Sequence, residues 1–600
     1  MKGLKKLLTN FLPQLAYFYS HLRYRMVVLL ITSIFVGLLD GLGLALFLPL
    51  LELIADSEAT ASAEKLGNLA FLLDGITAIG LELNLTVVLL TMLCFFIFKG
   101  IATFFERYMR VVYQQYFIAK IRLENIQALA NYSYNAFVSA DAGAIQNTMS
   151  GEVERVMQAF RTYSMMLQQL MMLLTYMGLA FVASPEFAVL IAIGGILSNF
   201  LFSTLYRKTK VLSKELVQRN HGFQGYVIQA VAFFKYLKAT ATIRKYAQFL
   251  EKKVVDIENT TRKMGVLNSI MMGLREPLMI GIVVGVIFIQ VNLIGGALST
   301  VILSLLFFYR GLTALTALQT SYNQFLGFSG SLENMSVFVA DLKANPTITG
   351  KDSFKGFRQE IVLKQIDFHY TAEKPILKKI DLKITKNDSV AFVGESGSGK
   401  TTLLNIVAGL INPKSGEYWI DGRKVNDLNI QSLQERIGYI TQDPVIFDDT
   451  VFNNVTFWDQ KTPENIKRFE TALQKAHIAQ LVEELTKKGD TRLGNNGVSL
   501  SGGQKQRISI ARELYKEVDF LFMDEATSAL DSETERAIQQ SIEALKGQYT
   551  IIMIAHRLST IKNVDKVVVL NQGKIDFIGA YHEVLEKSTA FKRMIQLQEV

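Results

Sequence analysis

The sequence predicts an α-helical domain with six membrane spans, followed by an α/β domain. Half of the 600 residues (50%) are hydrophobic, which is a high share for a chain made only of soluble domains. Long apolar stretches fill roughly the first 330 residues, whereas charges are interspersed through the rest, as in a soluble α/β domain. Between these parts, residues 345–356 are polar, contain Pro and Gly, and lack apolar periodicity, which is typical of a linker.

The membrane spans are predicted from stretches of about 20 apolar residues, the length that crosses the hydrocarbon core. Six stretches meet this condition: 26–54, 86–106, 163–183, 187–206, 266–292 and 298–325. An even number of spans places both ends of the domain on one side of the membrane. We therefore expect an N-terminal interfacial elbow helix, a transmembrane domain with two long cytoplasmic loops, a linker and the α/β domain, at 1–22, 23–335, 336–357 and 358–600 respectively.

The distribution of charge orients the spans. Residues 1–25 hold five Lys or Arg and no acid, and residues 207–263 hold thirteen basic and four acidic residues. Basic segments beside spans stay in the cytoplasm, so both termini and the α/β domain are predicted to be cytoplasmic. The acidic segment 55–85 is predicted to face outside. These segments account for the net charge of +9 and argue against a nucleic-acid partner, which would require a basic patch on a soluble domain.

Two cytoplasmic segments, 107–162 and 207–265, are long and helix-rich. They predict helices that continue below the membrane and turn back at 132–137 and 223–238. Such turns would press on the soluble domain and transmit force to it. The alternative is that both segments are merely solvated helical hairpins.

A phosphate-binding loop is predicted between an apolar strand, residues 389–393, and a helix that starts near Lys400. Glycines allow successive backbone N–H groups to curl around phosphate oxygens, and the helix N-terminus adds partial positive charge. Lys400 can reach the β- and γ-phosphates of ATP, and the Thr401 hydroxyl can ligate Mg²⁺. The predicted loop consists of Gly394, Glu395, Ser396, Gly397, Ser398, Gly399, Lys400, Thr401 and Thr402.

Carboxylates for hydrolysis follow a second apolar strand, residues 518–523, which ends in Asp524 and Glu525. Ligands bind at the carboxyl edge of parallel sheets. We expect Asp524 to organise Mg²⁺ and Glu525 to orient or deprotonate the attacking water. A third strand ends in His556, which is placed to hydrogen-bond the γ-phosphate.

The segment Ser501, Gly502, Gly503 and Gln504, after Leu500, matches the signature of the ATP-binding cassette (ABC) family. With the loop and carboxylates above in the same order, residues 358–590 resemble an ABC nucleotide-binding domain, and the whole chain resembles an exporter half-transporter of the type I exporter (type IV) fold. The resemblance implies that Tyr370 stacks on adenine, Gln442 senses Mg²⁺, and Asp531 joins two sites. It also implies a dimer, because the signature of one chain completes the ATP site of the other.

Two features bear on the form of the dimer and on coupling within it. All the motifs are intact in this chain, which favours a homodimer. Exporter relatives carry an acidic residue shortly before the signature, whereas this chain has Asn495. The ionic contact usually made by that loop is therefore in question.

Charged side chains inside spans mark functional sites, and Lys99, Arg275 and Arg310 lie in predicted spans. They are the candidate substrate cavity, suited to an anionic headgroup. The alternative is internal pairing, in which Asp40 or Glu276 neutralises an arginine. The membrane half, around Ser150-Gly151-Glu152-Val153 and Tyr309-Arg310, also resembles bacterial flippases for lipid-linked oligosaccharides, in which a basic belt lines the cavity.

These resemblances imply an ATP- and Mg²⁺-dependent flippase or exporter of an amphipathic lipid in the bacterial inner membrane. The expected substrate is a glycolipid or a lipid-linked oligosaccharide with a phosphate or pyrophosphate. An exporter of peptides or hydrophobic drugs is the alternative. A channel gated by ATP or an importer on the same scaffold is less favoured.

Overall fold

The computed structural model describes residues 13–600 apart from 48, 51–52, 54–70, 79, 83, 184, 290–297, 371–374, 495–496, 498–499, 525–539, 541, 556 and 597–600. The chain forms two compact units. The helical unit comprises Met1–Tyr132 and Ala140–Asn345, and the α/β unit comprises Ser133–Ser139 and Pro346–Val600. Each is described by itself.

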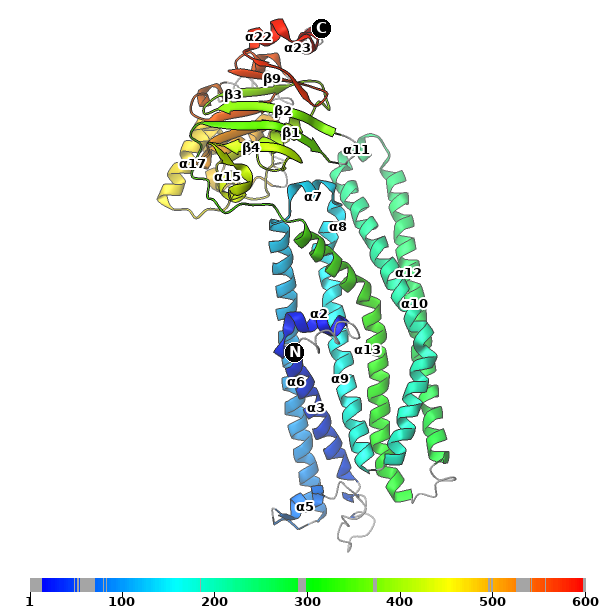
Figure 1. The fold of residues 1–600 in the computed structure, drawn as a ribbon. Helices are drawn as coiled ribbons and strands as arrows, with labels where there is room; N and C mark the ends of the chain where they lie inside the picture. Colours follow the sequence, from blue (N-terminus) through cyan, green and yellow to red (C-terminus); the bar gives the residue numbers. More distant parts are fainter. Residues whose placement is uncertain are drawn as a thin grey trace. The chain divides into compact units, whose positions relative to one another are not determined.

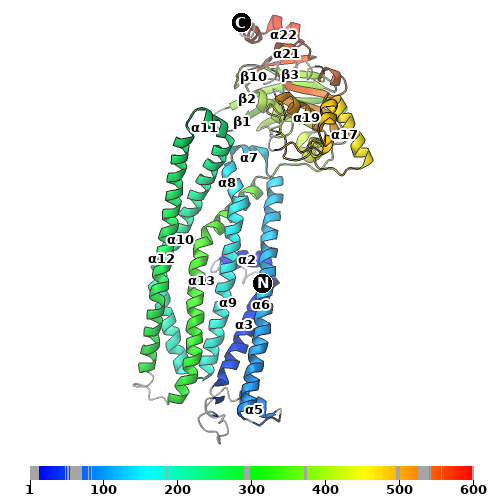
Figure 2. The same ribbon diagram turned by 180° about the vertical axis from the view of Figure 1, so that it is seen from behind.

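Six long helices run side by side in the helical unit (Figures 1 and 2). They are α3 (Tyr24–Ala45), α6 (Leu85–Ala130), α9 (Val153–Ala183), α10 (Pro185–Ala232), α12 (Ile243–Ile289) and α13 (Leu298–Ala344). Each contains most of one predicted span. Among the described residues, three helical segments are long and apolar enough to cross a membrane: Tyr24–Ala45, Leu85–Ala130 and Ala142–Val182.

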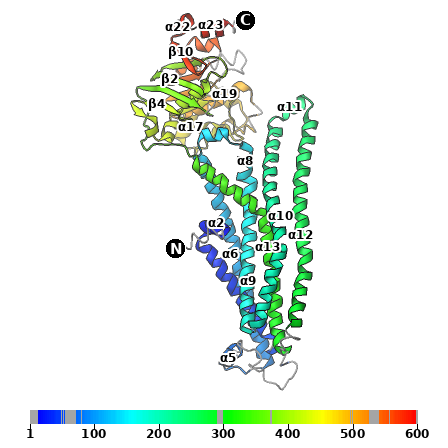
Figure 3. The ribbon, with the colours of Figure 1, turned by 45° about the vertical axis from the view of Figure 1, so that its right-hand side comes forward.

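Four of these helices, α6, α10, α12 and α13, have between 46 and 48 residues, more than twice the length of a span. The pair α10 and α12 is joined through the short helix α11 (Phe234–Ala239) at one end (Figure 3). Helix α13 continues to Ala344, so the first nine residues of the predicted linker, 336–344, are helical. The helix ends before Pro346, because the residue that precedes a proline disfavours helical backbone angles.

The short helix α2 (Pro13–Leu22) crosses the long helices of this unit (Figure 1). Its Phe18 side chain is fully buried, and the Phe18 ring centroid lies 4.9 Å from that of Tyr163 and 5.6 Å from that of Phe117. The apolar face of α2 is therefore anchored to α6 and α9 of its own unit. The rest of the predicted elbow, residues 1–12, lies outside the described residues.

The two predicted turns belong to different units of the chain. The first contains α7 (Tyr134–Ser139), and its residues Ser133–Ser139 group with the α/β unit. The chain then returns through α8 (Ala142–Asn147) and a π-helical turn, Thr148–Glu152, into α9. The second contains α11, which remains with the helical unit. Another short helix of this unit, α5 (Phe71–Ala78), precedes α6.

Two sheets form the α/β unit. The larger has the strand order β10-β9-β3-β8-β7-β6, and the smaller has β2-β1-β4-β5. In the larger sheet β3 pairs in parallel with β8 and β9, β7 pairs in parallel with β8 and β6, and only β10 is antiparallel. The smaller sheet is antiparallel. The strand bounds are β1 Glu360–His369, β2 Pro375–Thr385, β3 Ser389–Val393, β4 Ser415–Ile420, β5 Arg423–Lys424, β6 Ile437–Ile440, β7 Phe520–Asp524, β8 Thr550–Ile554, β9 Lys566–Asn571 and β10 Lys574–Gly579.

The core of this unit lies on both faces of the larger sheet, since every residue of β3 and β8 is buried. Strands buried on both faces are typical of a parallel sheet covered by helices. The helices are α14 (Lys400–Val407), α15 (Ile430–Gln434), α16 (Val451–Thr456), α17 (Pro463–Lys475), α18 (Ala479–Glu484), α19 (Gly502–Tyr515), α21 (Leu558–Ile561), α22 (Tyr581–Lys587) and α23 (Thr589–Gln596). The observed order, a helical membrane region followed by an α/β unit, confirms the predicted fold class.

Candidate functional site

The phosphate-binding loop lies between β3 and α14, as predicted. Its glycines adopt positive φ angles, 149° at Gly394, 81° at Gly397 and 104° at Gly399, where a residue with a side chain is strained. A Cβ added to Gly394 would lie 2.2 Å from the carbonyl O of Leu570. The loop can therefore keep this path only with glycine at position 394.

The polar groups of the loop fit a phosphate. The Lys400 ammonium donates hydrogen bonds to the carbonyl O atoms of Gly394 at 2.9 Å and Glu395 at 3.0 Å, so the side chain folds over the loop. The Ser398 hydroxyl is buried and makes no hydrogen bond to the described protein atoms. Thr401 is exposed in the first turn of α14, where helix N–H groups lack partners. A buried hydroxyl, a lysine and the N–H groups at the start of a helix together form an anion-binding cradle.

The parallel sheet brings the other predicted residues to the same edge. β7 ends at Asp524, β8 runs parallel between β7 and β3, and Gln442 is the second residue after the end of β6. In the parallel ladder of β6 and β7, Ile440 pairs with Met523, so Asp524, the next residue of β7, lies near the start of the loop that contains Gln442. Glu525, Asp531 and His556 lie outside the described residues.

Tyr370 directly follows β1 and is 45% exposed, with its ring 4.9 Å from that of Phe368 in an edge-to-face contact. One tyrosine face is therefore available for stacking. The signature residue Ser501 is the N-cap of α19: its Oγ accepts from the N–H of Gln504 at 3.3 Å, and its own N–H donates to Gln504 Oε1 at 2.9 Å. This capping box fixes the start of the helix and leaves Ser501 and Gly502 exposed.

In the helical unit, two of the three predicted cavity residues meet on one carboxylate. The Lys99 ammonium of α6 lies 2.5 Å from Asp40 Oδ1 of α3. The Tyr176 hydroxyl of α9 donates to Asp40 Oδ2, and the Arg310 Nε of α13 lies 4.0 Å from the same oxygen. Asp40 is 2% exposed. The internal pairing considered above is therefore present for Lys99 and Arg310, whereas the side chain of Arg275 lies outside the described residues.

Family models of known proteins match both parts of the chain. The family model for ABC transporters matches residues 377–528, and the one for the ABC transporter transmembrane region matches residues 26–314. The "Heterocyst differentiation ATP-binding protein HepA" of Nostoc sp. is 32% identical over 479 residues, which cover 79% of this chain and 77% of that protein. The chain belongs to the ABC transporter family.

Two further proteins are similar to this chain over most of their length. The "ATP-dependent lipid A-core flippase" of Cupriavidus pinatubonensis is 29% identical over 514 residues, covering 83% of this chain and 85% of that protein. A solved structure of a bacterial Atm1-family ABC exporter with ATP bound has a TM-score of 0.74 at 20% identity and covers 96% of this chain and 98% of that one, which shows the shared fold. This ABC transporter thus has the exporter fold, is embedded in a membrane, binds ATP and couples ATP hydrolysis to transport.

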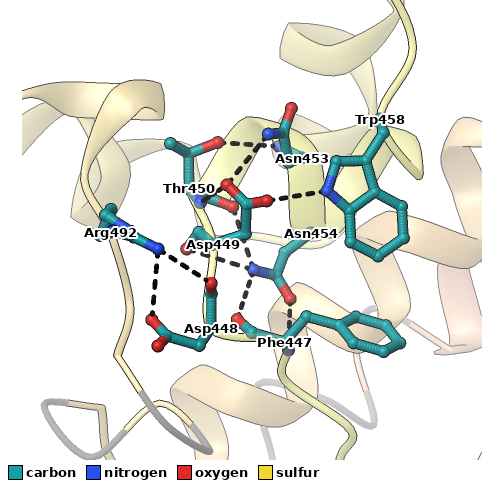
Figure 4. Close-up of polar contacts among 8 residues, drawn as sticks. All are labelled: Phe447, Asp448, Asp449, Thr450, Asn453, Asn454, Trp458 and Arg492. Carbon is teal, nitrogen blue, oxygen red and sulfur yellow. Dashed lines mark hydrogen bonds and ion pairs between the residues drawn. The ribbon is translucent and has the colours of Figure 1, made fainter. Parts of the chain in front are cut away.

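Sequence reasoning missed a polar cluster in the nucleotide-binding domain of the transporter, in the chain between Gln442 and the signature (Figure 4). Asp449 accepts from the indole N–H of Trp458 at 2.7 Å, the backbone N–H of Thr450 at 2.7 Å and Asn453 Nδ2 at 3.0 Å. The Trp458 bond above all lowers the pKa of Asp449. The available signal was Thr450, whose hydroxyl caps α16 by accepting from the N–H of Asn453, a common start of a helix.

The same cluster joins residues 448–451, which follow Gln442, to residues 491–493, which precede the signature. The N–H of Val451 donates to the carbonyl O of Thr491 at 3.0 Å, and the N–H of Leu493 donates to the carbonyl O of Asp449 at 3.0 Å. Arg492 Nη2 lies 4.0 Å from Asp448 Oδ1 (Figure 4). The chain after Gln442 is therefore bonded to the chain before Ser501. Asn495 lies outside the described residues.

Proposed function

We propose that this transporter is a flippase for an amphipathic lipid whose headgroup carries a phosphate or pyrophosphate. The observation that carries this proposal is the meeting of Lys99 and Arg310 beside Asp40, on three helices of the membrane domain. Charged groups within a span are expensive and tend to be kept for function. The fork of Arg310 suits a phosphate, and a relative is named a lipid A-core flippase.

ATP hydrolysis is assigned to the residues at the edge of the larger sheet. We assign phosphate binding to the loop from Gly394 to Thr402, with Lys400 on the β- and γ-phosphates and Tyr370 on adenine. Bound Mg²⁺ would neutralise phosphate charge and align the reacting oxygens, and its proposed ligands are Thr401, Gln442 and Asp524. We assign water activation to Glu525 and contact with the γ-phosphate to His556.

The functional unit is proposed to be a homodimer. One chain has one phosphate-binding loop and one signature, and the signature residues Ser501 and Gly503 would contact ATP bound to the other chain, with Asp531 joining the two sites. The proposed location is the bacterial inner membrane, with both termini in the cytoplasm.

The test is lipid movement in proteoliposomes. The transporter is reconstituted with a fluorescent phosphatidic acid, and the fraction of label that an impermeant quencher reaches is followed after ATP addition. We expect ATP-dependent movement of this lipid, little movement of the phosphatidylcholine analogue, and none with Glu525→Gln. Normal ATP hydrolysis without movement of any phosphate-bearing lipid, or stimulation only by peptides or hydrophobic drugs, would overturn the proposal.

A further inference from the structure

The charges around Asp40 do not balance, and this imbalance bears on the substrate. One carboxylate faces two cations, Lys99 and Arg310. Asp40 is 2% exposed, so its attraction to the two cations is screened much less than that of an exposed ion pair. Together, Lys99, Arg310 and Asp40 carry one excess positive charge. The Asp40 carboxylate is already paired with the two cations that would bind an anionic headgroup.

The two cations are held unequally. Lys99 is bonded directly to Asp40 at 2.5 Å and its side chain is 26% exposed, whereas Arg310 lies at the 4.0 Å limit of an ion pair and its side chain is 38% exposed. A guanidinium has five N–H donors, and only Nε faces Asp40 at this distance. Arg310 can therefore bind an incoming anion first, whereas Lys99 can bind it only after its ion pair with Asp40 breaks.

Tyr176 donates a hydrogen bond that Asp40 can keep when Lys99 leaves it. A buried carboxylate without a partner is strongly unfavourable. The Tyr176 hydroxyl donates to Asp40 Oδ2, while Lys99 occupies Oδ1. After Lys99 moves to another anion, Asp40 keeps the hydrogen bond from Tyr176, which lowers the cost of the exchange.

We propose that Asp40 is an internal counterion that an anionic headgroup must displace from Lys99 and Arg310, so that Asp40 sets the minimum headgroup charge. A headgroup with one negative charge offers the cations no more than Asp40 does, and Asp40 has the advantage of high effective concentration because it is part of the chain. A phosphomonoester or pyrophosphate has more charge and enough oxygens to bind both cations. Asp40 is thus a specificity-determining residue. This inference rests on the proposed flippase function.

The experiment measures ATP hydrolysis in phosphatidylcholine nanodiscs that contain increasing fractions of phosphatidic acid, a phosphomonoester, or phosphatidylglycerol, a phosphodiester with one charge. Stimulation is expressed relative to each variant's own rate without anionic lipid. For the wild type we expect half-maximal stimulation at a phosphatidic acid fraction about tenfold lower than the phosphatidylglycerol fraction, because the second charge outweighs the counterion.

The variants shift the titrations in opposite directions. Asp40→Asn removes the competitor, so both titrations shift to lower lipid fractions and the tenfold preference shrinks to about twofold or less. Tyr176→Phe keeps the carboxylate but makes its release more costly, so both titrations shift to higher fractions. Glu154→Gln, which breaks the exposed ion pair with Arg122, is the matched control and leaves both curves in place.

The double variant Asp40→Asn with Lys99→Met covers the case in which Asp40→Asn does not fold. It replaces both Asp40 and Lys99, so neither residue is left as a charge without its partner. This variant should also lose the preference for phosphatidic acid. Retention of the wild-type preference in Asp40→Asn or in the double variant overturns the counterion role while the flippase proposal stands, provided that Arg310→Ala abolishes the wild-type response. Absence of stimulation by either lipid in the wild type overturns both.

Discussion

Arg512 of the signature helix α19 binds Asn454 of α16 twice: its Nε donates to the backbone O of Asn454 at 2.6 Å, and its Nη2 donates to Asn454 Oδ1 at 3.1 Å. The guanidinium is buried and lies 5.3 Å from the ring centroids of both Phe447 and Phe457. Burial lowers its pKa below the ordinary value. The helix that begins at the signature is therefore fixed to the helix that follows the Gln442 loop.

Replacing this arginine should destabilise the nucleotide-binding domain. Arg512→Met keeps an apolar chain but removes two hydrogen bonds from a charged donor, each of which contributes roughly 1.5–3 kcal/mol. We expect a loss of about 3–6 kcal/mol, measured as a lower thermal unfolding temperature of the purified transporter. The control is Arg492→Met, because the Arg492 side chain is 72% exposed and its partner Asp448 is 4.0 Å away; exposed pairs contribute about 1 kcal/mol or less. Equal effects of the two substitutions would contradict the role of Arg512.

The stability contributed by Asp449 should depend on pH. The hydrogen bond from Trp458, followed by those from Thr450 and Asn453, lowers the pKa of Asp449 below its ordinary 3.8. A lowered pKa means that the folded state favours the carboxylate, so this stabilisation is complete above the unfolded-state pKa and is lost as the pH falls through the folded-state pKa. We expect Asp449→Asn to lower the unfolding temperature at pH 7. The difference from wild type should shrink as the pH is lowered toward 3, and a difference independent of pH would disprove the assignment.

The glycines of the phosphate-binding loop should tolerate alanine unequally. A Cβ at Gly394 would lie 2.2 Å from the carbonyl O of Leu570, whereas a Cβ at Gly397 meets no atom within 4 Å. Both positions have positive φ angles, so both substitutions cost about 1 kcal/mol of backbone strain. Only Gly394→Ala must also move the backbone. We expect at least a tenfold weaker affinity for a fluorescent ATP analogue with Gly394→Ala than with Gly397→Ala; the reverse order would show that the loop rearranges.

The proposed role of Glu525 predicts that Glu525→Gln slows ATP hydrolysis but leaves ATP binding nearly unchanged. The amide cannot accept a proton from water, and general-base catalysis contributes about 10²- to 10⁴-fold. We expect the rate of ATP hydrolysis to fall within that range while the affinity for ATP stays within about threefold, because Lys400 and the loop backbone bind the phosphates. Phosphate release and equilibrium binding of labelled ATP measure the two quantities. Hydrolysis near the wild-type rate would remove Glu525 from water activation.

Elements whose signals lie within a short stretch of chain were predicted well from the sequence. The phosphate-binding loop lies between a buried strand and a helix at the predicted residues, because a β-strand, three glycines and a helix start constrain the backbone locally. Most of each predicted span lies in one of the six long helices for a similar reason, since the length of the apolar stretch predicts a span. The linker was predicted to begin at 336, but α13 continues to Ala344 and ends only where Pro346 follows.

The sequence by itself determined the fold class and the family motifs, and it identified Lys99 and Arg310 as unusual charges. Only the tertiary structure decided that both meet Asp40, with Tyr176 on the same carboxylate, and that Arg512 binds Asn454 across 58 positions. Composition and periodicity indicate which face of a helix is apolar. They leave open the rotation and register at which one helix packs against another, and the partner of a buried charge depends on both.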